Sequence, residues 1–230
     1  MIDARLLLRS DMFGGLDEAA LTAVVAAVSV RRLTAGTTIF AQGDPGHTCH
    51  SLLEGRVKIV QTRPDGGQSV LRFIGSGEMY GTVAAMMNKP FPADAVAVLD
   101  SVEIVWPVAA MRRLIREWPE IGISSTASAG GRLFELQRRM GDLTGERVEQ
   151  RIARAVMRLG EQAGRRTDAG IEIDFPLTRQ DLAEMAGATL HTVSRTLSAW
   201  DHHGVTASTR RRIVIRDAEA LAALASEPGA

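Results

Sequence analysis

The segment Leu177–Leu197 contains the residues whose chemistry is easiest to interpret, and that chemistry is hydrogen bonding to nucleic acid. Its pattern predicts two short helices, and on the second of them Leu190, His191, Ser194 and Arg195 share the outer face. Side chains at the N-terminal end of such a helix reach base edges in a major groove. The guanidinium of Arg195 can donate two hydrogen bonds to guanine O6 and N7, and Ser194 can contact either kind of base pair. We expect these four side chains to read DNA bases.

A second group of polar and basic residues suits phosphate oxygens, which accept hydrogen bonds from hydroxyls, amides and arginines. We expect contacts to the DNA backbone from Thr178, Arg179, Gln180, Thr189, Thr192, Arg210, Arg211 and Arg212. Backbone amides at the two helix starts would add further donors. Because phosphates are the same at every base pair, these contacts would supply affinity without sequence preference.

Two caps and a turn glycine would position these side chains. Thr178 can cap the first helix, with Asp181 three residues later in a capping-box arrangement. Gly187 permits a tight turn between the helices, and Thr189 can cap the second one. The apolar positions that we expect to be buried are Leu182, Met185, Ala186, Val193 and Leu197.

A hairpin is predicted after the two helices, from Gly204-Val205 through Arg210–Arg212 to the strand Ile213–Ile215. It would form a wing whose arginines face the DNA backbone. The alternative is a plain pair of helices with solvated arginines. Because caps, turn, buried face, polar face and wing all agree, a winged helix-turn-helix is favoured.

Composition excludes several other classes of protein. The chain has 230 residues, 45% hydrophobic and 23% charged, with 27 Lys and Arg against 27 Asp and Glu, so disorder and a polyelectrolyte character are not expected. No apolar run reaches the roughly 20 residues of a spanning helix, and no signal peptide is predicted. The single cysteine, Cys49, excludes a disulfide framework and fits a cytoplasmic protein. The sequence contains no pair of carboxylates and no nucleophile–base arrangement that would indicate an enzyme.

The sequence of the N-terminal half predicts a helix over Leu16–Val28 followed by an antiparallel β-roll. Between Val30 and Val108, short apolar runs alternate with turn clusters at regular spacing. The cluster Pro64–Gly67 is typical of a hairpin between two strands. The strands are predicted at Thr37–Phe40, Ser51–Leu53, Val57–Val60, Ser69–Ile74, Ala95–Leu99 and Val102–Trp106.

A long helix is predicted after Trp118-Pro119, with an apolar seam at spacings of 3, 4, 3, 4 and 3. The seam consists of Thr126, Ala129, Leu133, Leu136, Met140 and Leu143. It indicates a parallel coiled coil between two subunits; the alternative is packing on the helix's own domain. The predicted fold is thus α+β, with a β-roll sensor at 1–108, a hinge and dimerisation helix at 109–144, and a winged helix-turn-helix at 145–230.

This order of parts resembles the Crp/Fnr superfamily of bacterial transcription regulators. The positions of the turn glycines in the roll are similar too, at Gly43-Asp44, Glu54–Val57 and Gly77–Gly81. The stretch Thr189–Arg195 is most similar to the nitrogen-oxide and oxygen-responsive branches, such as the NnrR/Dnr-like regulators. The resemblance implies a homodimer that binds inverted-repeat DNA and contacts RNA polymerase. A different reading of the same parts is a ligand-binding or protein-interaction module whose winged helix does not read DNA.

The resemblance also implies where an effector would bind. We expect its pocket at Cys49, Met79, Tyr80, Gly81, Thr82, Leu133, Leu136 and Gln137. In cyclic-nucleotide members a Glu and an Arg-Ser or Arg-Thr pair follow the glycine turn, whereas this chain has Thr82 and then Pro92-Ala93. A buried phosphate needs cations or several N–H donors, so cyclic AMP is not expected. An iron–sulfur cluster is not expected either, because the N-terminal cysteine cluster of Fnr is absent.

Haem is the cofactor that the sequence leaves open. His47, Cys49 and His50 lie together, and imidazole or thiolate can ligate haem iron. The competing interpretation is a core cysteine beside surface or hydrogen-bonded histidines. On a strand, His47 and Cys49 would share one face and His50 would take the other.

The recognition helix generates a prediction about specificity. Fnr-type members commonly carry Glu-x-x-Ser-Arg and bind a TTGAT-like half-site, whereas this chain has His191-x-x-Ser194-Arg195. We expect half-sites with a TTG-like core, with Arg195→Ala costing about 1–3 kcal/mol and losing the guanine preference. His191→Glu should shift preference toward the Fnr-type half-site, because a carboxylate accepts a hydrogen bond from cytosine N4. Binding-site selection on randomised DNA measures both; an unchanged motif for His191→Glu would show that this residue does not contact bases.

Overall fold

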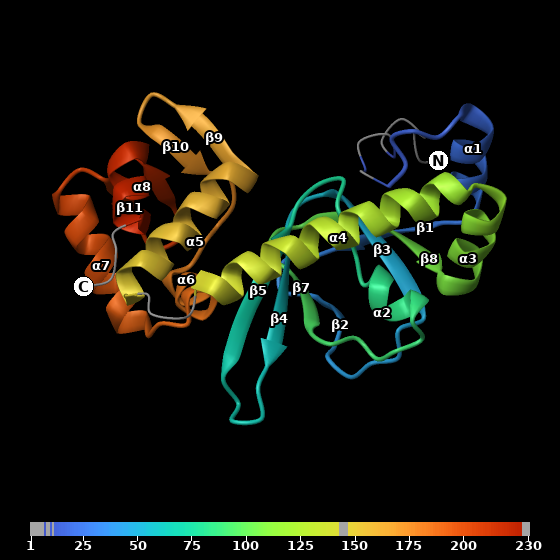
Figure 1. Cartoon of the computed structure of the whole chain (residues 1–230), viewed down its shortest axis with the longest axis horizontal. Coiled ribbons are helices and arrows are strands. Elements are labelled where there is room, and N and C mark those ends of the chain that lie inside the picture. The colour runs from blue at the N-terminus through green and yellow to red at the C-terminus, as the bar shows by residue number, and fades with distance from the viewer. Residues whose placement is uncertain (1–6, 8–9, 11, 143–146, 227–230) are drawn as a thin grey trace. The chain divides into compact units, whose positions relative to one another are not determined.

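The computed structural model describes residues 7, 10, 12–142 and 147–226, without the side chains of 135, 136 and 138–142. The chain divides into two compact units, one of residues 1–67 and 71–137 and one of residues 68–70 and 138–230. Antiparallel sheets and helices occur in both (Figure 1), which confirms the predicted α+β class. No helix in the described ranges is both long and apolar enough to cross a membrane.

The N-terminal unit is built on two four-stranded sheets. The first has the order β1 (Ser29–Leu33), β8 (Ser101–Pro107), β3 (Thr48–Glu54), β6 (Met79–Tyr80); the second has the order β2 (Thr38–Phe40), β7 (Asp94–Ala97), β4 (Val57–Thr62), β5 (Gln68–Ile74). Residues of both sheets, such as Leu52 and Val57, form one buried cluster. The predicted turn joins β4 and β5, with the Arg63 N–H donating to Gly67 O at 2.8 Å. Strands β1 and β6 were not predicted; four of the five β1 residues are exposed, so it lacks the expected alternation.

Helices cover the outer side of the first sheet. They are α1 (Glu18–Ala26), α2 (Thr82–Met86), α3 (Val108–Glu117) and α4 (Pro119–Asp142). Asp17 caps α1 by accepting the Ala20 N–H at 2.8 Å, and Pro119 opens α4, as predicted. Trp106, which is fully buried, joins this layer by donating its indole N–H to Val24 O at 3.2 Å.

The apolar seam predicted on α4 lies partly on an exposed face. Leu133 is 57% exposed and Thr126 is exposed, whereas Ala129 is half-buried. Leu143 and the side chains of Leu136 and Met140 lie outside the described residues. Two exposed apolar residues that the prediction omitted, Ile123 at 70% and Phe134 at 74%, lie on the same side as Leu133. The exposed stripe of α4 is therefore defined by Ile123, Thr126, Ala127, Leu133, Phe134 and Gln137, with the half-buried Gly130 among them.

The C-terminal unit packs helices on one small sheet. Its helices are α5 (Val148–Ala163), α6 (Arg179–Ala186), α7 (Leu190–His202) and α8 (Ala218–Ser226). The sheet has the order β11 (Thr206–Ser208), β12 (Ile213–Ile215), β10 (Gly170–Ile173), β9 (Gly164–Thr167). Strand β9 was not predicted; its exposed arginines hide the strand pattern. Strand β9 pairs with β10, and β10 in turn pairs with β12, so the two strands extend the hairpin formed by β11 and β12 into a four-stranded sheet.

Candidate nucleic-acid interface and effector pocket

The two predicted caps fix the ends of α6 and α7. The Thr178 hydroxyl accepts the Asp181 N–H at 3.0 Å, and the Asp181 carboxylate accepts the Thr178 N–H at 3.2 Å. Gly187 ends α6 at φ 59°, a left-handed conformation that glycine adopts without strain. The Thr189 hydroxyl accepts the Thr192 N–H at 3.1 Å. The local sequence thus forms the helix–turn–helix that was expected from it.

Helix α7 presents the predicted base-reading residues on its outer side. Val193, Leu197 and Trp200 are buried on the inner side. His191 and Arg195 are exposed, Ser194 is half-buried, and Leu190 is 48% exposed. Sequence reasoning missed Ser198, which is exposed one turn beyond Ser194 and donates to its carbonyl at 2.8 Å.

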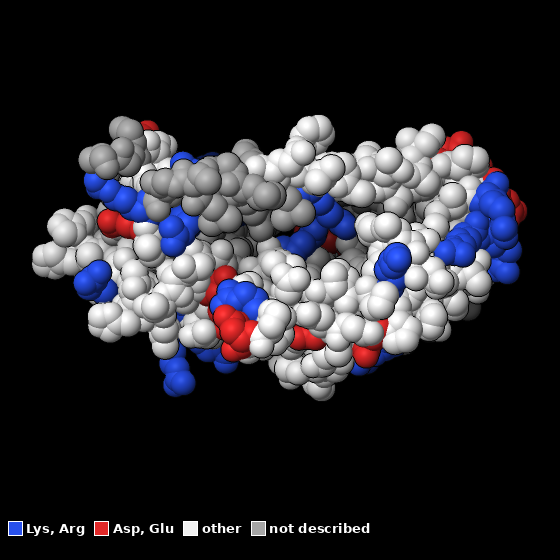
Figure 2. Space-filling view, turned by 60° about the horizontal axis from the view of Figure 1, so that its bottom comes forward, with Lys and Arg blue, Asp and Glu red and all other residues white. Residues whose placement is uncertain are grey.

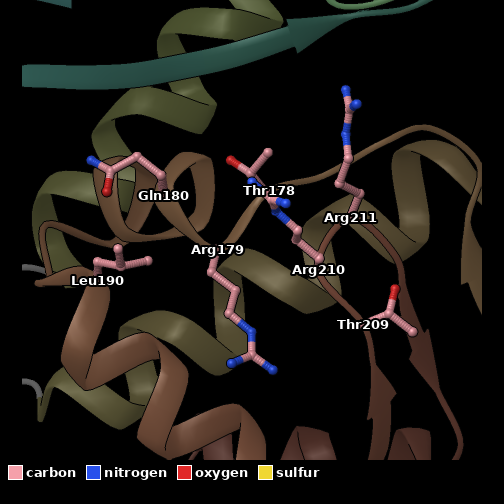
Figure 3. A pocket seen from close by; sticks show the side chains of 7 residues that line it. All are labelled: Thr178, Arg179, Gln180, Leu190, Thr209, Arg210 and Arg211. Atoms are coloured by element: carbon pink, nitrogen blue, oxygen red, sulfur yellow. The ribbon is translucent and has the colours of Figure 1, made fainter.

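The wing brings two arginines to the N-terminal ends of the helices. A hollow of about 820 Å³ is lined by Thr178, Arg179, Gln180, Leu190, Thr209, Arg210 and Arg211 (Figure 3). Within it, Arg179 and Arg211 point in opposite directions (Figure 3). The Leu177 N–H donates to Arg211 O at 3.0 Å, which holds the wing loop beside the start of α6. Five of the eight predicted backbone contacts therefore line one concave surface.

Two of the arginines among the predicted phosphate contacts are engaged inside the unit. The Arg212 guanidinium pairs with Glu172, at 2.5 Å from Nε to Oε1 and 2.6 Å from Nη2 to Oε2. Arg179 donates to the Ser208 hydroxyl at 3.3 Å. Arg195, Arg210 and Arg211 make no ion pair with any residue that the structure describes. Arg212 is consequently the weakest of the three wing candidates, because a phosphate would compete with Glu172.

Long-range bonds that the sequence pattern did not reveal hold this arrangement together. Asp201, near the end of α7, accepts from Thr206 at 2.6 Å and from Ser208 at 2.7 Å, which fixes α7 to β11. Arg151 of α5 donates to Ala186 O at 2.9 Å and caps the C-terminal end of α6. Its partner is 35 residues away, so no local spacing could have indicated this role.

Basic side chains do not form one continuous stripe on the surface in view. Figure 2 shows Lys and Arg groups scattered among acidic and uncharged residues, in keeping with the formal net charge of zero. DNA attraction would therefore depend on the local arginines of the wing and α7 rather than on the charge of the whole chain.

The N-terminal unit contains a cavity of about 350 Å³ beside α2. Four predicted effector residues line it: Met79, Tyr80, Gly81 and Thr82. Cys49 does not line it and lies in the other core cluster, beside Trp106. Leu133 and Gln137 are exposed and do not line it, and the side chain of Leu136 lies outside the described residues.

The cavity walls also include residues outside the predicted effector set, namely Phe40, Ile59, Arg72, Ile74, Val83, Ala84, Met87, Lys89, Pro90, Phe91, Pro92, Ala93 and Arg132. Gly81 adopts φ 69°, and a Cβ atom there would lie 3.0 Å from Phe91 and 3.3 Å from His50. Strand alternation could have indicated the apolar wall residues, but only the fold brings Arg132 of α4 to them.

A buried polar network lies behind the cavity wall. The Glu103 carboxylate, which is fully buried, accepts from Tyr80 and lies 3.0 Å from His50 Nδ1 and 3.4 Å from Arg31 Nη1. Burial and the neighbouring Glu103 charge raise the pKa of Tyr80 above its usual range. The network holds the Tyr80 ring in one orientation and keeps its hydroxyl protonated.

The residues proposed as haem ligands do not converge. Both His50 ring nitrogens are within hydrogen-bond distance of other side chains, Nδ1 of Glu103 at 3.0 Å and Nε2 of Thr48 at 2.8 Å. Cys49 is fully buried in the other core cluster, and His47 is exposed. The donor set therefore does not fit haem, and the described residues contain no cluster of three or more His, Cys, Asp or Glu that could hold a metal ion.

Comparison with known proteins finds a matching protein family for a segment of each unit. Residues 30–117 match the cyclic nucleotide-binding domain, and residues 150–224 match the Crp-like helix-turn-helix domain. The CRP-like cAMP-activated global transcriptional regulator of Mycobacterium tuberculosis is 26% identical over 217 residues, covering 94% of this chain and 97% of that protein. The chain belongs to the Crp/Fnr family.

Other members of the Crp/Fnr family agree in sequence and fold. The nitrogen fixation regulation protein FixK of Rhizobium meliloti is 29% identical over 190 residues, covering 82% of this chain and 83% of FixK. The structure of FixK2 from Bradyrhizobium japonicum has the same fold, with a TM-score of 0.76 at 19% identity, covering 87% of this chain and 98% of FixK2. These relatives are transcription regulators rather than enzymes. The chain is thus a Crp/Fnr-type DNA-binding regulator with a cyclic-nucleotide-binding-like domain.

The environment of Cys49 predicts an unreactive thiol. Burial raises the pKa of Cys49 to about 12. Because the thiolate is the nucleophile, only about one molecule in 10,000 would be ionised at pH 8. We expect no reaction of the native protein with Ellman's reagent at pH 8 and one full equivalent in guanidinium chloride. Rapid reaction of the native protein would contradict this burial.

Proposed function

We propose that the protein is a homodimeric transcription regulator that binds an inverted-repeat operator through residues 189–197 and responds to a small molecule, gas or redox signal through its β-roll. The observation that supports this most is the capped helix α7, whose polar outer face lies beside the arginines of the wing. Such a helix fits a major groove while the wing contacts the adjacent backbone.

Within this proposal, residues have distinct roles. Leu190, His191, Ser194 and Arg195 contact base edges, with Arg195 on a guanine of a TTG-like half-site. The backbone contacts come from Thr178, Arg179, Gln180, Thr189, Thr192, Arg210, Arg211 and, more weakly, Arg212. Because a two-fold dimer places two recognition helices on one face of DNA, the half-sites lie about one helical turn apart.

Dimerisation is assigned to α4. The exposed stripe of α4 carries Ile123, Leu133 and Phe134, all more than half exposed in the single chain. Burying such side chains against a second copy removes apolar surface from water at roughly 25 cal/mol per Å². Because the residues follow a heptad-like spacing, a parallel pairing of two α4 helices suits them.

The remaining assignments extend the proposal to the cell. The proposal divides the chain into a sensor at 1–108, a hinge and dimerisation helix at 109–144 and a DNA-binding domain at 145–230. It also places the protein in the cytoplasm and includes contact with RNA polymerase. The Mycobacterium tuberculosis relative is described as cAMP-activated. For this chain cyclic AMP is not the proposed effector, because Thr82 and Pro92-Ala93 stand where the cyclic-nucleotide members hold the ribose and phosphate.

The wing provides a test of DNA binding with an internal control. Arg211→Ala should weaken binding to specific and unrelated DNA alike and flatten the salt slope by about one unit, because one phosphate contact is lost. Arg212→Ala should have a smaller effect on both, because Glu172 already holds that guanidinium. Fluorescence anisotropy on the protein's own upstream DNA over a salt series measures both variants. No binding by the unmodified protein at low salt, with or without candidate effectors, would refute DNA binding.

The α4 stripe provides a test of dimerisation. Leu133→Asp should give a monomer with almost no operator binding, because an unpaired charge in the seam costs far more than the contact it replaces. Val30→Asp, at a residue of β1 that is 51% exposed, is the matched control and should remain dimeric. Multi-angle light scattering measures the mass of each variant. A dimeric Leu133→Asp protein would place the interface elsewhere.

A further inference from the structure

The cavity beside α2 has aromatic and aliphatic walls. Phe40 and Phe91 stack with ring centroids 3.8 Å apart and planes at 16°, and Tyr80 lies 6.0 Å from Phe40. Ile74, Met87 and other apolar residues complete the lining. Its volume of about 350 Å³ falls at the lower end of the range of ligand pockets, roughly 300–1,000 Å³. The walls suit one small, flat, apolar ring.

The charged side chains that line the cavity are all cationic among the described residues. Arg72, Lys89 and Arg132 line it, and no Asp or Glu whose side chain the structure describes does. Arg72 pairs with Glu78, and Arg132 donates to Met79 O at 2.8 Å. The Lys89 side chain is exposed and makes no hydrogen bond or ion pair with the described part of the chain. A ligand with one negative charge at its end would therefore be matched electrostatically at Lys89.

The cavity offers few other polar groups to a ligand. Among the described lining residues, only Thr82 and Tyr80 supply side-chain hydroxyls, and the Tyr80 hydroxyl already donates to Glu103. A ligand with several hydroxyls or ring nitrogens would leave polar groups unpaired, at about 1–3 kcal/mol for each buried one. A nucleotide is such a ligand, whereas an aromatic acid has one polar end.

We propose that the β-roll binds an aryl carboxylate, with the ring packed against the cavity wall formed by Phe40, Phe91 and Tyr80 and the carboxylate at Lys89. This identifies the effector class of the proposed regulator and so rests on the proposed function, but ligand binding can be measured without DNA. The charge of the acid selects it over neutral ring compounds of the same shape.

Tyr80 permits a measurement at the site itself, because it is the only tyrosine of the chain. Full-length protein labelled with 3-fluorotyrosine gives one ¹⁹F resonance, from the cavity wall. We expect this resonance to shift in a saturable way with at least one of benzoate, phenylacetate and 3-phenylpropionate. The corresponding amide should bind about tenfold more weakly, because a charge-assisted hydrogen bond is lost. Cyclic AMP should leave the resonance unchanged.

The two lysines of the chain give a matched pair of variants. Lys89→Gln should weaken carboxylate binding about tenfold and leave amide binding within about twofold, because only the charged contact changes. Lys58→Gln, on β4 and outside the cavity lining, should change neither affinity. Thermal unfolding of both variants checks that they fold.

Each outcome decides the proposal. No shift with any of the three acids at millimolar concentration overturns it, as does a saturable shift with cyclic AMP at lower concentration. Equal affinity for acid and amide, or an unchanged preference in Lys89→Gln, overturns the assignment of the anion to Lys89. Binding of an acid by a protein that binds no DNA would refute the proposed function while supporting the pocket.

Discussion

The position of α7 is the constraint on which the DNA-binding unit depends. This helix must bury Val193, Leu197 and Trp200 and still present Arg195 to solvent. Burial fixes the rotation of the helix about its axis, but it does not fix the tilt. The tilt is set at one end by the turn at Gly187 and at the other by the hydrogen bonds of Asp201 to β11.

The same bonds place the wing. Ser208 donates to Asp201 and accepts from Arg179, so the first residue of α6, the end of α7 and the strand β11 share one polar contact. The Glu172 carboxylate engages Arg212 from the neighbouring strand β10. Of three consecutive arginines, the fold thus pairs one and leaves Arg210 and Arg211 at the concave surface. The number of arginines in the wing sequence is therefore larger than the number that the fold leaves available to contact a phosphate.

In the β-roll, a buried charge organises the cavity. Glu103 is an expensive residue to bury unless it is paired, and here Tyr80, His50 and Arg31 all approach its oxygens. The network fixes Tyr80 as a wall and occupies the histidine that could otherwise bind a metal. Because Glu103 and Thr48 lie within hydrogen-bond distance of the two His50 ring nitrogens, this histidine is not available to ligate haem iron.

The sequence by itself determined the order of the parts and the local geometry of the helix–turn–helix. The caps at Thr178 and Thr189 and the turn at Gly187 act within four residues, so spacing was enough to predict them. Tertiary structure decided what depends on distant partners: the pairing of Arg212 with Glu172, the cap that Arg151 gives α6, and the arrival of Arg132 at the cavity. It also showed Phe134 on the exposed side of α4. A heptad pattern identifies an apolar face but not which edge of that face the chain's own domain covers, because that depends on packing between elements far apart in the chain.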